Sequence, residues 1–337
     1  MKIVFFETKD YEKKYFEGVL KSHELLFFDF PLNEETADVA KDAEIISVFV
    51  FSQVNEGVVS KLTKTKFIAT RSTGYDHIDL EACRQKGILV SNIPSYGVET
   101  VAEHAFSLML AISRKIFESL EQTRKGDFYN ENLTGFQLKD KVLGIIGAGK
   151  IGKRVAELAK AFGMKVLAYD LFQDEEAAKK IGYQYVEFET LLKESDIITL
   201  HANLTKQNYH LLNELAFQKM KNGVIIINTA RGGLIDTAAF IKYLKEGKIR
   251  AAGIDVLEEE SQEKEEIKLL YEDKLSKDEL QKLLADHILV DLEDQNKNVL
   301  ITPHNAFNSI EALDEIMATN AKNILAFINQ TPINLVK

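Results

Sequence analysis

The chain has 337 residues and carries 42 Lys and Arg against 52 Asp and Glu, which leaves a formal net charge of −10 at neutral pH. That length is enough for two ordinary domains, each with its own buried core. The acidity argues against general binding to nucleic acids or to anionic membranes, because both partners are polyanions.

Short apolar runs alternate with amphipathic stretches over most of the chain. The first series of predicted strands comprises residues 3–6, 25–30, 45–49, 67–70 and 88–90, with predicted helices at 11–21, 34–40 and 80–86. The second series comprises residues 142–146, 166–169, 197–200, 224–228, 251–256 and 299–301. Buried Val, Ile and Phe runs separated by helices are typical of parallel sheets covered on both faces. Two such series predict two doubly wound α/β domains.

The pattern changes near residues 95–100, where the two series join. Residues 93–97 form a predicted loop, and apolar side chains then recur at helical spacing from 101 to 118. We expect this helix to be long enough to cross between the domains. Farther along, residues 258–297 are rich in acids, and we interpret them as a solvated insertion, with Glu260 as the exception.

The sequence indicates a reducing, cytoplasmic compartment. Residues 1–7 contain an apolar run that is too short for a signal peptide and ends at Glu7. No stretch approaches the roughly 20 apolar residues that cross a bilayer. The single cysteine, Cys83, excludes an internal disulfide and a thiolate metal cage, so we expect no metal site and an unreactive, structural thiol.

A glycine-rich turn follows the predicted strand 142–146 and opens a helix. In it, Gly147 permits a tight turn, Gly149 the close approach of a pyrophosphate, and Gly152 close packing of helix and strand. The next strand ends at Asp170, where a carboxylate can bind the ribose hydroxyls of NAD and repel the 2′-phosphate of NADP. Strand, glycines, helix and acid together predict an NAD-binding Rossmann domain.

Three strand ends of the second series carry side chains that suit a dehydrogenase. Such an enzyme needs a group that exchanges the hydroxyl proton, a cation for an anionic substrate, and a carboxylate that tunes the first group. Arg231 follows the strand 224–228, Glu260 the strand that ends near 254, and His304 the strand 299–301. Because open α/β sheets bind ligands at the carboxyl ends of their strands, we expect these three to form the catalytic group.

Several motifs resemble the D-isomer-specific 2-hydroxyacid dehydrogenases, and the resemblance spans nearly the whole chain. They are the segments 71–79 (RSTGYDHID), 96–104 (YGVETVAEH), 133–136 (LTGF), 147–152 (GAGKIG) and 228–236 (NTARGGLID). Within that family, residues 208–214 (NYHLLNE) are most similar to the fermentative D-lactate dehydrogenases.

The resemblance implies reduction of pyruvate to D-lactate by NADH. His304 would give its proton to the carbonyl oxygen, Glu260 would contact His304 and favour its imidazolium form, and Arg231 would bind the carboxylate and carbonyl oxygens of the 2-oxo acid. Reduction should therefore weaken as the pH rises. Two departures from the family stand out: Asn203 occupies a position that is usually Pro, and the interval between Glu260 and His304 is long.

The resemblance also implies the remaining contacts. Backbone amides at Thr73 and Gly74 would hold the substrate carboxylate, and Tyr96 and Phe307 would line the pocket or pack in the core. The aromatic side chains of Phe49, Phe51, Tyr96 and Phe307 would set the pocket size and favour a small substrate. Besides Gly147, Gly149, Gly152 and Asp170, the cofactor contacts would be Lys150, Ile151, Ala202, Asn203, Asn208, Asn228, Thr229, Ala230 and Asp255.

Three other histidines compete with His304 for the catalytic role. We interpret His77 as structural and His104 as an inter-domain packing residue, because both precede the catalytic strand ends. His201 ends a strand near the cofactor, but no acid stands at a predictable partner position.

The resemblance implies a discontinuous substrate-binding domain of flavodoxin-like fold, residues 1–99 and 305–337, and a Rossmann domain, residues 100–304, with a cleft between them that closes on binding. It also implies a homo-oligomer, a dimer or a dimer of dimers. Two alternatives stay open: a dehydrogenase for a bulkier acid such as D-2-hydroxyisocaproate, and an NAD-sensing scaffold similar to the C-terminal-binding corepressors. Turnover separates the enzyme from the scaffold.

Overall fold

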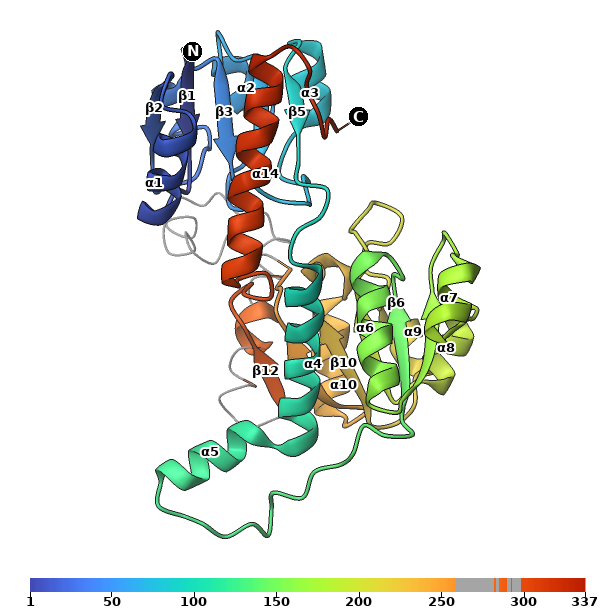
Figure 1. The fold of residues 1–337 in the computed structure, drawn as a ribbon. Coiled ribbons are helices and arrows are strands. Elements are labelled where there is room, and N and C mark those ends of the chain that lie inside the picture. Colours follow the sequence, from blue (N-terminus) through green and yellow to red (C-terminus); the bar gives the residue numbers. More distant parts are fainter. Residues whose placement is uncertain (259–281, 283–284, 290–291, 293–297, 337) are drawn as a thin grey trace. The chain divides into compact units, whose positions relative to one another are not determined.

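The computed structural model describes residues 1–258, 282, 285–289, 292 and 298–336, and the chain divides into two compact units (Figure 1). Unit 1 comprises Met1–Gly97 and Asn308–Lys337, and unit 2 comprises Val98–Phe307. The boundaries expected at 99/100 and 304/305 lie close to these divisions, and Phe307 falls in unit 2 together with His304. In the described part of the chain, no helix is both long and apolar enough to cross a membrane.

Unit 1 is built on a five-stranded parallel sheet in the order β2-β1-β3-β4-β5. Its strands are β1 (Lys2–Phe5), β2 (Glu24–Phe27), β3 (Ile45–Val48), β4 (Phe67–Thr70) and β5 (Leu89–Ser91). Its helices are α1 (Asp10–Val19), η1 (Ala37–Ala40), α2 (Glu56–Lys61), α3 (Leu80–Gln85) and α14 (Ile310–Ile328). The last helix comes from the far end of the chain, so unit 1 is discontinuous.

Both faces of this sheet are covered, as its continuous apolar strands predict. Ile3 and Phe5 pack with α1 and α14 on one face, while Val4 and Phe6 pack with η1, α2 and α3 on the other. Successive strand residues point to opposite faces, so a strand between two helical layers must be apolar at every position. Cys83 is buried on the α3 side.

Unit 2 is built on a seven-stranded parallel sheet in the order β12-β11-β10-β9-β6-β7-β8. Its strands are β6 (Val142–Ile146), β7 (Lys165–Tyr169), β8 (Gln184–Tyr185), β9 (Ile197–Leu200), β10 (Val224–Asn228), β11 (Ile249–Ile254) and β12 (Val299–Ile301). Its described helices include α4 (Val98–Arg114), α5 (Ile116–Arg124), α6 (Lys150–Ala161), α7 (Glu175–Ile181), α8 (Phe188–Glu194), α9 (Glu214–Lys219), η2 (Gly232–Leu234) and α10 (Thr237–Lys245). The two-residue strand β8 was not predicted from the sequence.

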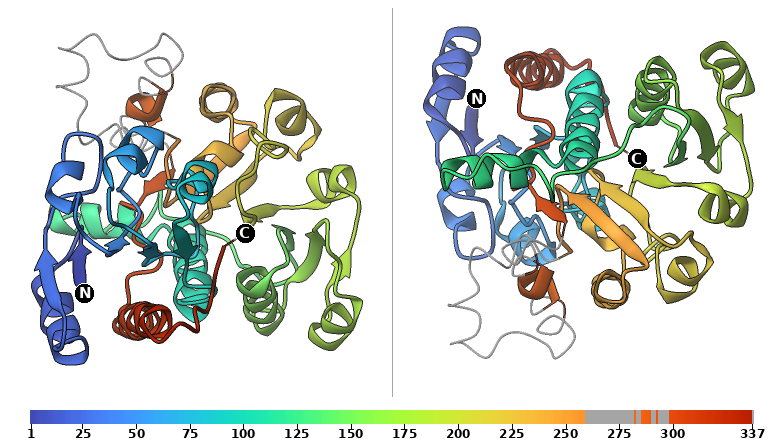
Figure 2. Two further views of the ribbon diagram at one scale, coloured as in Figure 1. Left: turned by 90° about the horizontal axis from the view of Figure 1, so that it is seen from above. Right: turned by 90° about the horizontal axis from the view of Figure 1, so that it is seen from below.

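The two faces of the unit 2 sheet carry separate cores. Figure 2 shows α4 and α6 (teal and green) on one side of the sheet and the olive and gold helices α9 and α10 on the other. Several helices begin at a side chain that caps their first amides, among them Asn213, Asp236 and Asp174. The fold class predicted from the sequence, two doubly wound parallel-sheet domains, is confirmed.

Two predicted helices differ from the structure by more than two residues at an end. The helix expected over 101–118 is broken at Lys115, whose φ of 52° is left-handed, so α4 ends and α5 begins there. The returning chain makes the break: the Phe136 N–H donates to the Ser113 carbonyl at 2.8 Å, and a Cβ on Gly135 would lie 2.2 Å from that same oxygen. The helix expected over 34–40 is only the short 3₁₀ helix η1.

Candidate active site

The strand order places the predicted site residues along one edge of the unit 2 sheet. All of its strands are parallel, so their carboxyl ends meet at the same edge. Read along β12, β11, β10, β9, β6 and β7, that edge carries His304, Asp255, Arg231, His201, the glycine turn and Asp170. The site residues predicted in unit 2 therefore share this edge, except Glu260, which lies outside the described residues.

The glycine turn joins β6 to α6 next to the loop that follows β9. Gly147 has a left-handed φ of 93°, and a Cβ there would lie 2.5 Å from the Ala202 amide nitrogen. At Gly152 a Cβ would lie 2.1 Å from the Gly147 carbonyl oxygen, so the helix packs directly on the turn. By contrast, a Cβ on Gly149 would meet nothing within 4 Å. Neighbouring backbone therefore packs tightly against the turn at Gly147 and Gly152. At Gly149 the turn faces open space, and there α6 presents the positive end of its dipole.

Asp170 is fixed by the glycine turn that it faces. One carboxylate oxygen accepts the Ala148 N–H at 2.7 Å, and the other accepts the Phe172 N–H at 2.9 Å. Leu171 and Phe172, which follow Asp170, are more than four-fifths exposed in the described part of the chain, so this corner of unit 2 is open to solvent there. The carboxylate is held in one orientation beside the turn, as a ribose ligand requires.

The loop after β9 is closed by Asn208. Its amide group donates to the Asn203 carbonyl at 2.7 Å and accepts the Thr205 N–H at 2.7 Å. Asn208 therefore shapes the segment that contains Ala202 and Asn203, beside the glycine turn. At the start of this loop, His201 Nε2 lies 2.9 Å from Thr199 Oγ1, and burial lowers the pKa of this imidazole to about 3.

Asn228, at the end of β10, shapes the turn that carries Arg231. Its buried side chain donates to the Arg231 carbonyl at 2.9 Å and accepts the Ala230 N–H at 3.0 Å. The Arg231 guanidinium donates to the Ala230 carbonyl at 2.8 Å. A Cβ on Gly232 would lie 2.1 Å from the Leu257 carbonyl oxygen, so the Arg231 turn packs against the loop after β11.

His304 sits in a turn that Asp255 holds. The His304 N–H donates to the backbone carbonyls of Asp255 and Thr302, both at 2.9 Å. The Asp255 carboxylate accepts the N–H groups of Asn305 at 2.8 Å and Ala306 at 2.9 Å and also the Thr302 hydroxyl. The ring of Phe307 lies edge-on to the His304 ring, with 6.3 Å between centroids. Asp255 was expected only as a cofactor contact, and its second role, holding the His304 turn, was not predicted from the sequence.

His104 extends the same network from α4. Its Nε2 lies 3.1 Å from Thr302 Oγ1 and 3.5 Å from an Asp255 carboxylate oxygen. The expectation for His104 was packing between the domains, whereas these polar contacts all lie within unit 2. No local sequence signal links residue 104 to residues 255 and 302.

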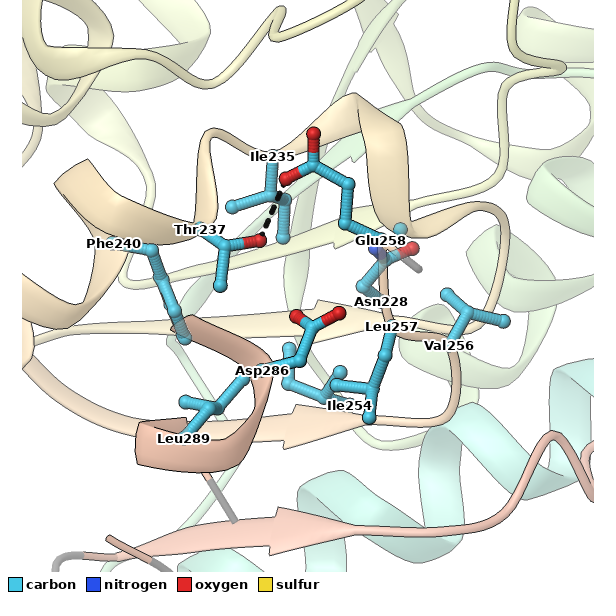
Figure 3. Close-up of a pocket in the computed structure, with 11 residues that line it drawn as sticks. Asn228, Ile235, Thr237, Phe240, Ile254, Val256, Leu257, Glu258, Asp286 and Leu289 are labelled. Carbon is cyan, nitrogen blue, oxygen red and sulfur yellow. Dashed lines mark hydrogen bonds between the residues drawn. The ribbon is translucent and has the colours of Figure 1, made fainter. Parts of the chain in front are cut away.

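Glu258 forms a second polar cluster two residues before Glu260 in the sequence. The Glu258 side chain is 3% exposed. Its carboxylate accepts hydrogen bonds from Tyr209 Oη and, at 2.9 Å, from Thr237 Oγ1, and it lies 2.7 Å from His210 Nε2. Glu258 and Asp286 both line a small pocket that has room for about one water molecule, and Figure 3 shows the Glu258 carboxylate bonded to Thr237 at its edge. We expected Glu258 to be solvated, and this expectation is wrong because the side chain is buried and hydrogen-bonded.

Thr73, Gly74 and Tyr96, three of the substrate residues expected outside the cofactor domain, lie in unit 1, whereas the fourth, Phe307, lies in unit 2. Thr73 and Gly74 follow β4, where the Thr73 hydroxyl donates to the Ile93 carbonyl at 2.8 Å and the Ser72 hydroxyl donates to the Gly74 carbonyl at 2.6 Å. These bonds use the hydroxyl and carbonyl groups and shape the turn, leaving the backbone N–H groups of Thr73 and Gly74 without an acceptor among the described residues. Tyr96 is partly buried near the end of unit 1.

The edge of unit 2 fits a bound dinucleotide. Gly149 faces open space where a pyrophosphate would approach the α6 N-terminus, and Asp170 is oriented beside it. Thr229 Oγ1 and His201 Nδ1 are buried and have no hydrogen-bond partner in the described part of the chain, which leaves them available to a ligand at this edge. Among the described residues, no cluster of three His, Cys, Asp or Glu side chains could hold a metal ion.

One edge of this parallel sheet carries a glycine turn at a helix N-terminus, an acid at the end of the next strand, an arginine and a histidine. This combination defines a dinucleotide-dependent oxidoreductase of the doubly wound class. The D-isomer specific 2-hydroxyacid dehydrogenase NAD-binding domain matches residues 106–306. The chain belongs to this family, which confirms the resemblance stated above, and NAD is the cofactor of its matching domain.

Known relatives agree over nearly the full length. The chain is 42% identical to the D-lactate dehydrogenase of Escherichia coli K12 over 96% of both chains. The structure of D-lactate dehydrogenase from Aquifex aeolicus, complexed with NAD and lactic acid, matches with a TM-score of 0.89 at 36% identity, covering 99% of this chain and 98% of the other. D-2-hydroxyisocaproate dehydrogenase matches with a TM-score of 0.80 at 32% identity, covering 100% and 99%.

Proposed function

We propose that this protein is an NAD-dependent D-lactate dehydrogenase of the fermentative type, which reduces pyruvate to D-lactate. The observation that carries the proposal is the order of side chains along one sheet edge. A proton-exchanging His304 and a cationic Arg231 lie two strands apart on the same edge as the glycine turn. The similarity to two D-lactate dehydrogenases over nearly the whole chain supports pyruvate as the substrate.

In the proposed reaction, NADH supplies a hydride to C2 of the 2-oxo acid. His304, as imidazolium, gives its proton to the carbonyl oxygen, so that one hydride and one proton together convert the ketone to the hydroxyl. Arg231 binds the carboxylate and polarises the carbonyl with its planar fork of donors. Glu260 favours the imidazolium form of His304, and the N–H groups of Thr73 and Gly74 hold the carboxylate.

Each chain segment around the glycine turn has a proposed part in binding the cofactor. Gly149, Lys150 and Ile151 would lie against the pyrophosphate and Asp170 against the adenosine ribose. The remaining proposed contacts are Gly147, Gly152, Ala202, Asn203, Asn208, Asn228, Thr229, Ala230 and Asp255. Tyr96 and Phe307 are proposed to line the substrate pocket.

A dehydrogenase for a bulkier D-2-hydroxy acid is the second candidate. The match to D-2-hydroxyisocaproate dehydrogenase over the full chain favours it. The aromatic side chains of Phe49, Phe51, Tyr96 and Phe307 favour the smaller pyruvate, because rings of that size leave little space for a branched chain.

We also propose a homo-oligomer in a reducing, cytoplasmic compartment. α5 and the segment after it project from the body of unit 2 (Figure 1) and expose apolar side chains: Ile116, Phe117, Leu120, Phe128 and Tyr129. A patch of this kind favours burial against a second copy. Sedimentation of the purified protein distinguishes a monomer from a dimer or a dimer of dimers.

A panel of 2-oxo acids with NADH and NADPH tests the function. The proposal expects the highest kcat/KM for pyruvate with NADH. A preference for 2-oxoisocaproate would favour the second candidate. Tight NADH binding with negligible turnover of every acid would instead indicate a scaffold.

A further inference from the structure

Glu7 lies just beyond β1, and its side chain is the anchor of the loop that follows β3. One carboxylate oxygen accepts the N–H of Phe49 at 3.0 Å, the N–H of Ser52 at 3.1 Å and the Ser52 hydroxyl at 2.5 Å. The other oxygen accepts the Phe51 N–H at 2.9 Å. One side chain thus receives four hydrogen bonds from a loop of four residues, an arrangement that fixes the loop's path.

The backbone of Glu7 is held as firmly as its side chain. Its φ of 53° is left-handed, a conformation that costs a non-glycine residue free energy unless the surroundings impose it. The Glu7 N–H donates to the Phe30 carbonyl at 3.1 Å, and the Glu7 carbonyl accepts from the Arg71 guanidinium at 2.9 Å. Ser52 is fully buried and also accepts the Leu32 N–H at 3.0 Å.

Arg71 connects this anchor to the next strand end. It is 1% exposed, and its backbone N–H donates to the Val48 carbonyl at 2.8 Å. Val48 is the last residue before the loop. Its guanidinium carbon lies 5.6 Å from the centroid of the Phe49 ring. β3 and β4 are neighbours in register, so the loop 49–52 and the turn with Thr73 and Gly74 leave adjacent strands at the same edge of the unit 1 sheet.

We infer that Glu7 is a positioning residue for substrate selectivity, holding Phe49 and Phe51 beside the turn that receives the substrate carboxylate. This inference rests on the proposed function, in which Thr73 and Gly74 bind that carboxylate. A 2-oxo acid held there presents the alkyl group on its C2 carbonyl to the neighbouring side chains. Fixed aromatic rings then favour a methyl group on C2, as in pyruvate. Releasing the loop weakens the binding of that methyl group more than it improves the binding of a larger group.

The substitution Glu7→Gln tests this with little change in size. The glutamine amide keeps one acceptor oxygen. Its NH₂ group is a hydrogen-bond donor and cannot accept the loop N–H groups that were bonded to the other carboxylate oxygen. Ser52→Ala removes one of the four hydrogen bonds and leaves Glu7 in place. Glu17→Gln, the same chemical change on the exposed face of α1, is the matched control.

The experiment measures kcat and KM for pyruvate and 2-oxoisocaproate with NADH, the dissociation constant of NADH by fluorescence, and the midpoint of thermal unfolding. For Glu7→Gln we expect kcat/KM for pyruvate to fall roughly tenfold, mainly through KM, while the value for 2-oxoisocaproate changes by less than about threefold. Ser52→Ala should change the selectivity ratio in the same direction by less. NADH affinity in both variants, and every constant of Glu17→Gln, should match the unsubstituted protein.

An unchanged selectivity ratio in Glu7→Gln and Ser52→Ala overturns the inference and leaves the proposed function intact. Equal losses for both acids together with weaker NADH binding also overturn it, because they indicate a general structural role. If Glu7→Gln does not fold, the selectivity ratio of Ser52→Ala tests the inference alone. If the unsubstituted protein reduces no 2-oxo acid, the proposed function fails, and the inference fails with it.

Discussion

His304 is held in place by Asp255: the backbone N–H of His304 donates to the backbone carbonyl of Asp255 at 2.9 Å. The Asp255 carboxylate, fully buried, accepts the next two N–H groups of the same turn, those of Asn305 and Ala306. These bonds hold His304 in a left-handed conformation with φ of 51°. The end of β11 thus builds the turn that presents the proposed proton donor at the end of β12.

Asp255→Asn should therefore lower kcat without removing a reacting group. An amide can accept only on its oxygen, so its NH₂ group must oppose one of the donors of the His304 turn. We expect kcat for pyruvate reduction to fall about 10- to 100-fold, less than the roughly 10²- to 10⁴-fold that general acid catalysis contributes, because the acid is misplaced and not removed. Asp314→Asn, an exposed change on α14, serves as the control. Unchanged kcat in Asp255→Asn would show that the turn keeps its shape without the carboxylate.

Asp170 should determine the choice between NADH and NADPH. Its carboxylate is fixed by two backbone N–H groups beside the glycine turn, where a 2′-phosphate would meet its negative charge. Asp170→Ser should raise kcat/KM for NADPH and lower it for NADH, each by roughly tenfold. Asp174→Asn, four residues farther on, should keep the original ratio of the two constants. A ratio that stays the same in Asp170→Ser as well would contradict the ribose-binding role.

Cys83 should react slowly with thiol reagents in the native protein. Burial, and to a smaller extent the negative charge of Asp79, raise the pKa of this thiol to about 11. Because the thiolate is the nucleophile, little of the reactive form exists near pH 8. The chain has one cysteine, so alkylation by iodoacetamide reports on this site alone. Mass spectrometry should find rapid labelling only after unfolding in denaturant; equal rates in the two states would exclude a buried thiol.

The buried imidazole of His201 should lower the free energy of unfolding as the pH decreases. Burial lowers the pKa of His201 from its ordinary 6.5 to about 3, so between these values the unfolded chain binds a proton that the native protein does not. This contribution to stability is complete above pH 6.5 and is lost as the pH falls towards 3. Between pH 7 and pH 5, the free energy of unfolding of the unsubstituted protein should fall by about 2 kcal/mol more than that of His201→Asn. Denaturant unfolding at the two pH values measures the difference, and parallel losses would contradict it.

The sheet edges were predictable because their pattern is local. Continuous apolar runs bounded by polar turns identify buried parallel strands, and strand order then brings their carboxyl ends together. Gly147 and Asp170 could be recognised from their spacing, since tight turns and ribose contacts impose it. The family membership and the NAD cofactor followed from the same residues.

Other features depend on contacts between distant parts of the chain. Lys115 breaks the long helix because residues 135–136 return against its end, and no Gly or Pro marks the position. Glu7 and Glu258 have the sequence context of solvated acids, yet both receive hydrogen bonds from segments far away along the chain. The pairing of Glu260 with His304 stays a prediction, because Glu260 lies outside the described residues.

The chirality of the product tests the central claim most directly. The purified protein is incubated with pyruvate and NADH, and the lactate formed is resolved on a chiral column, with His304→Asn in parallel. We expect D-lactate in a one-to-one ratio with the NADH oxidised, and a loss of at least about a hundredfold in kcat for His304→Asn. Formation of L-lactate, absence of NADH oxidation, or full activity of His304→Asn would contradict the account.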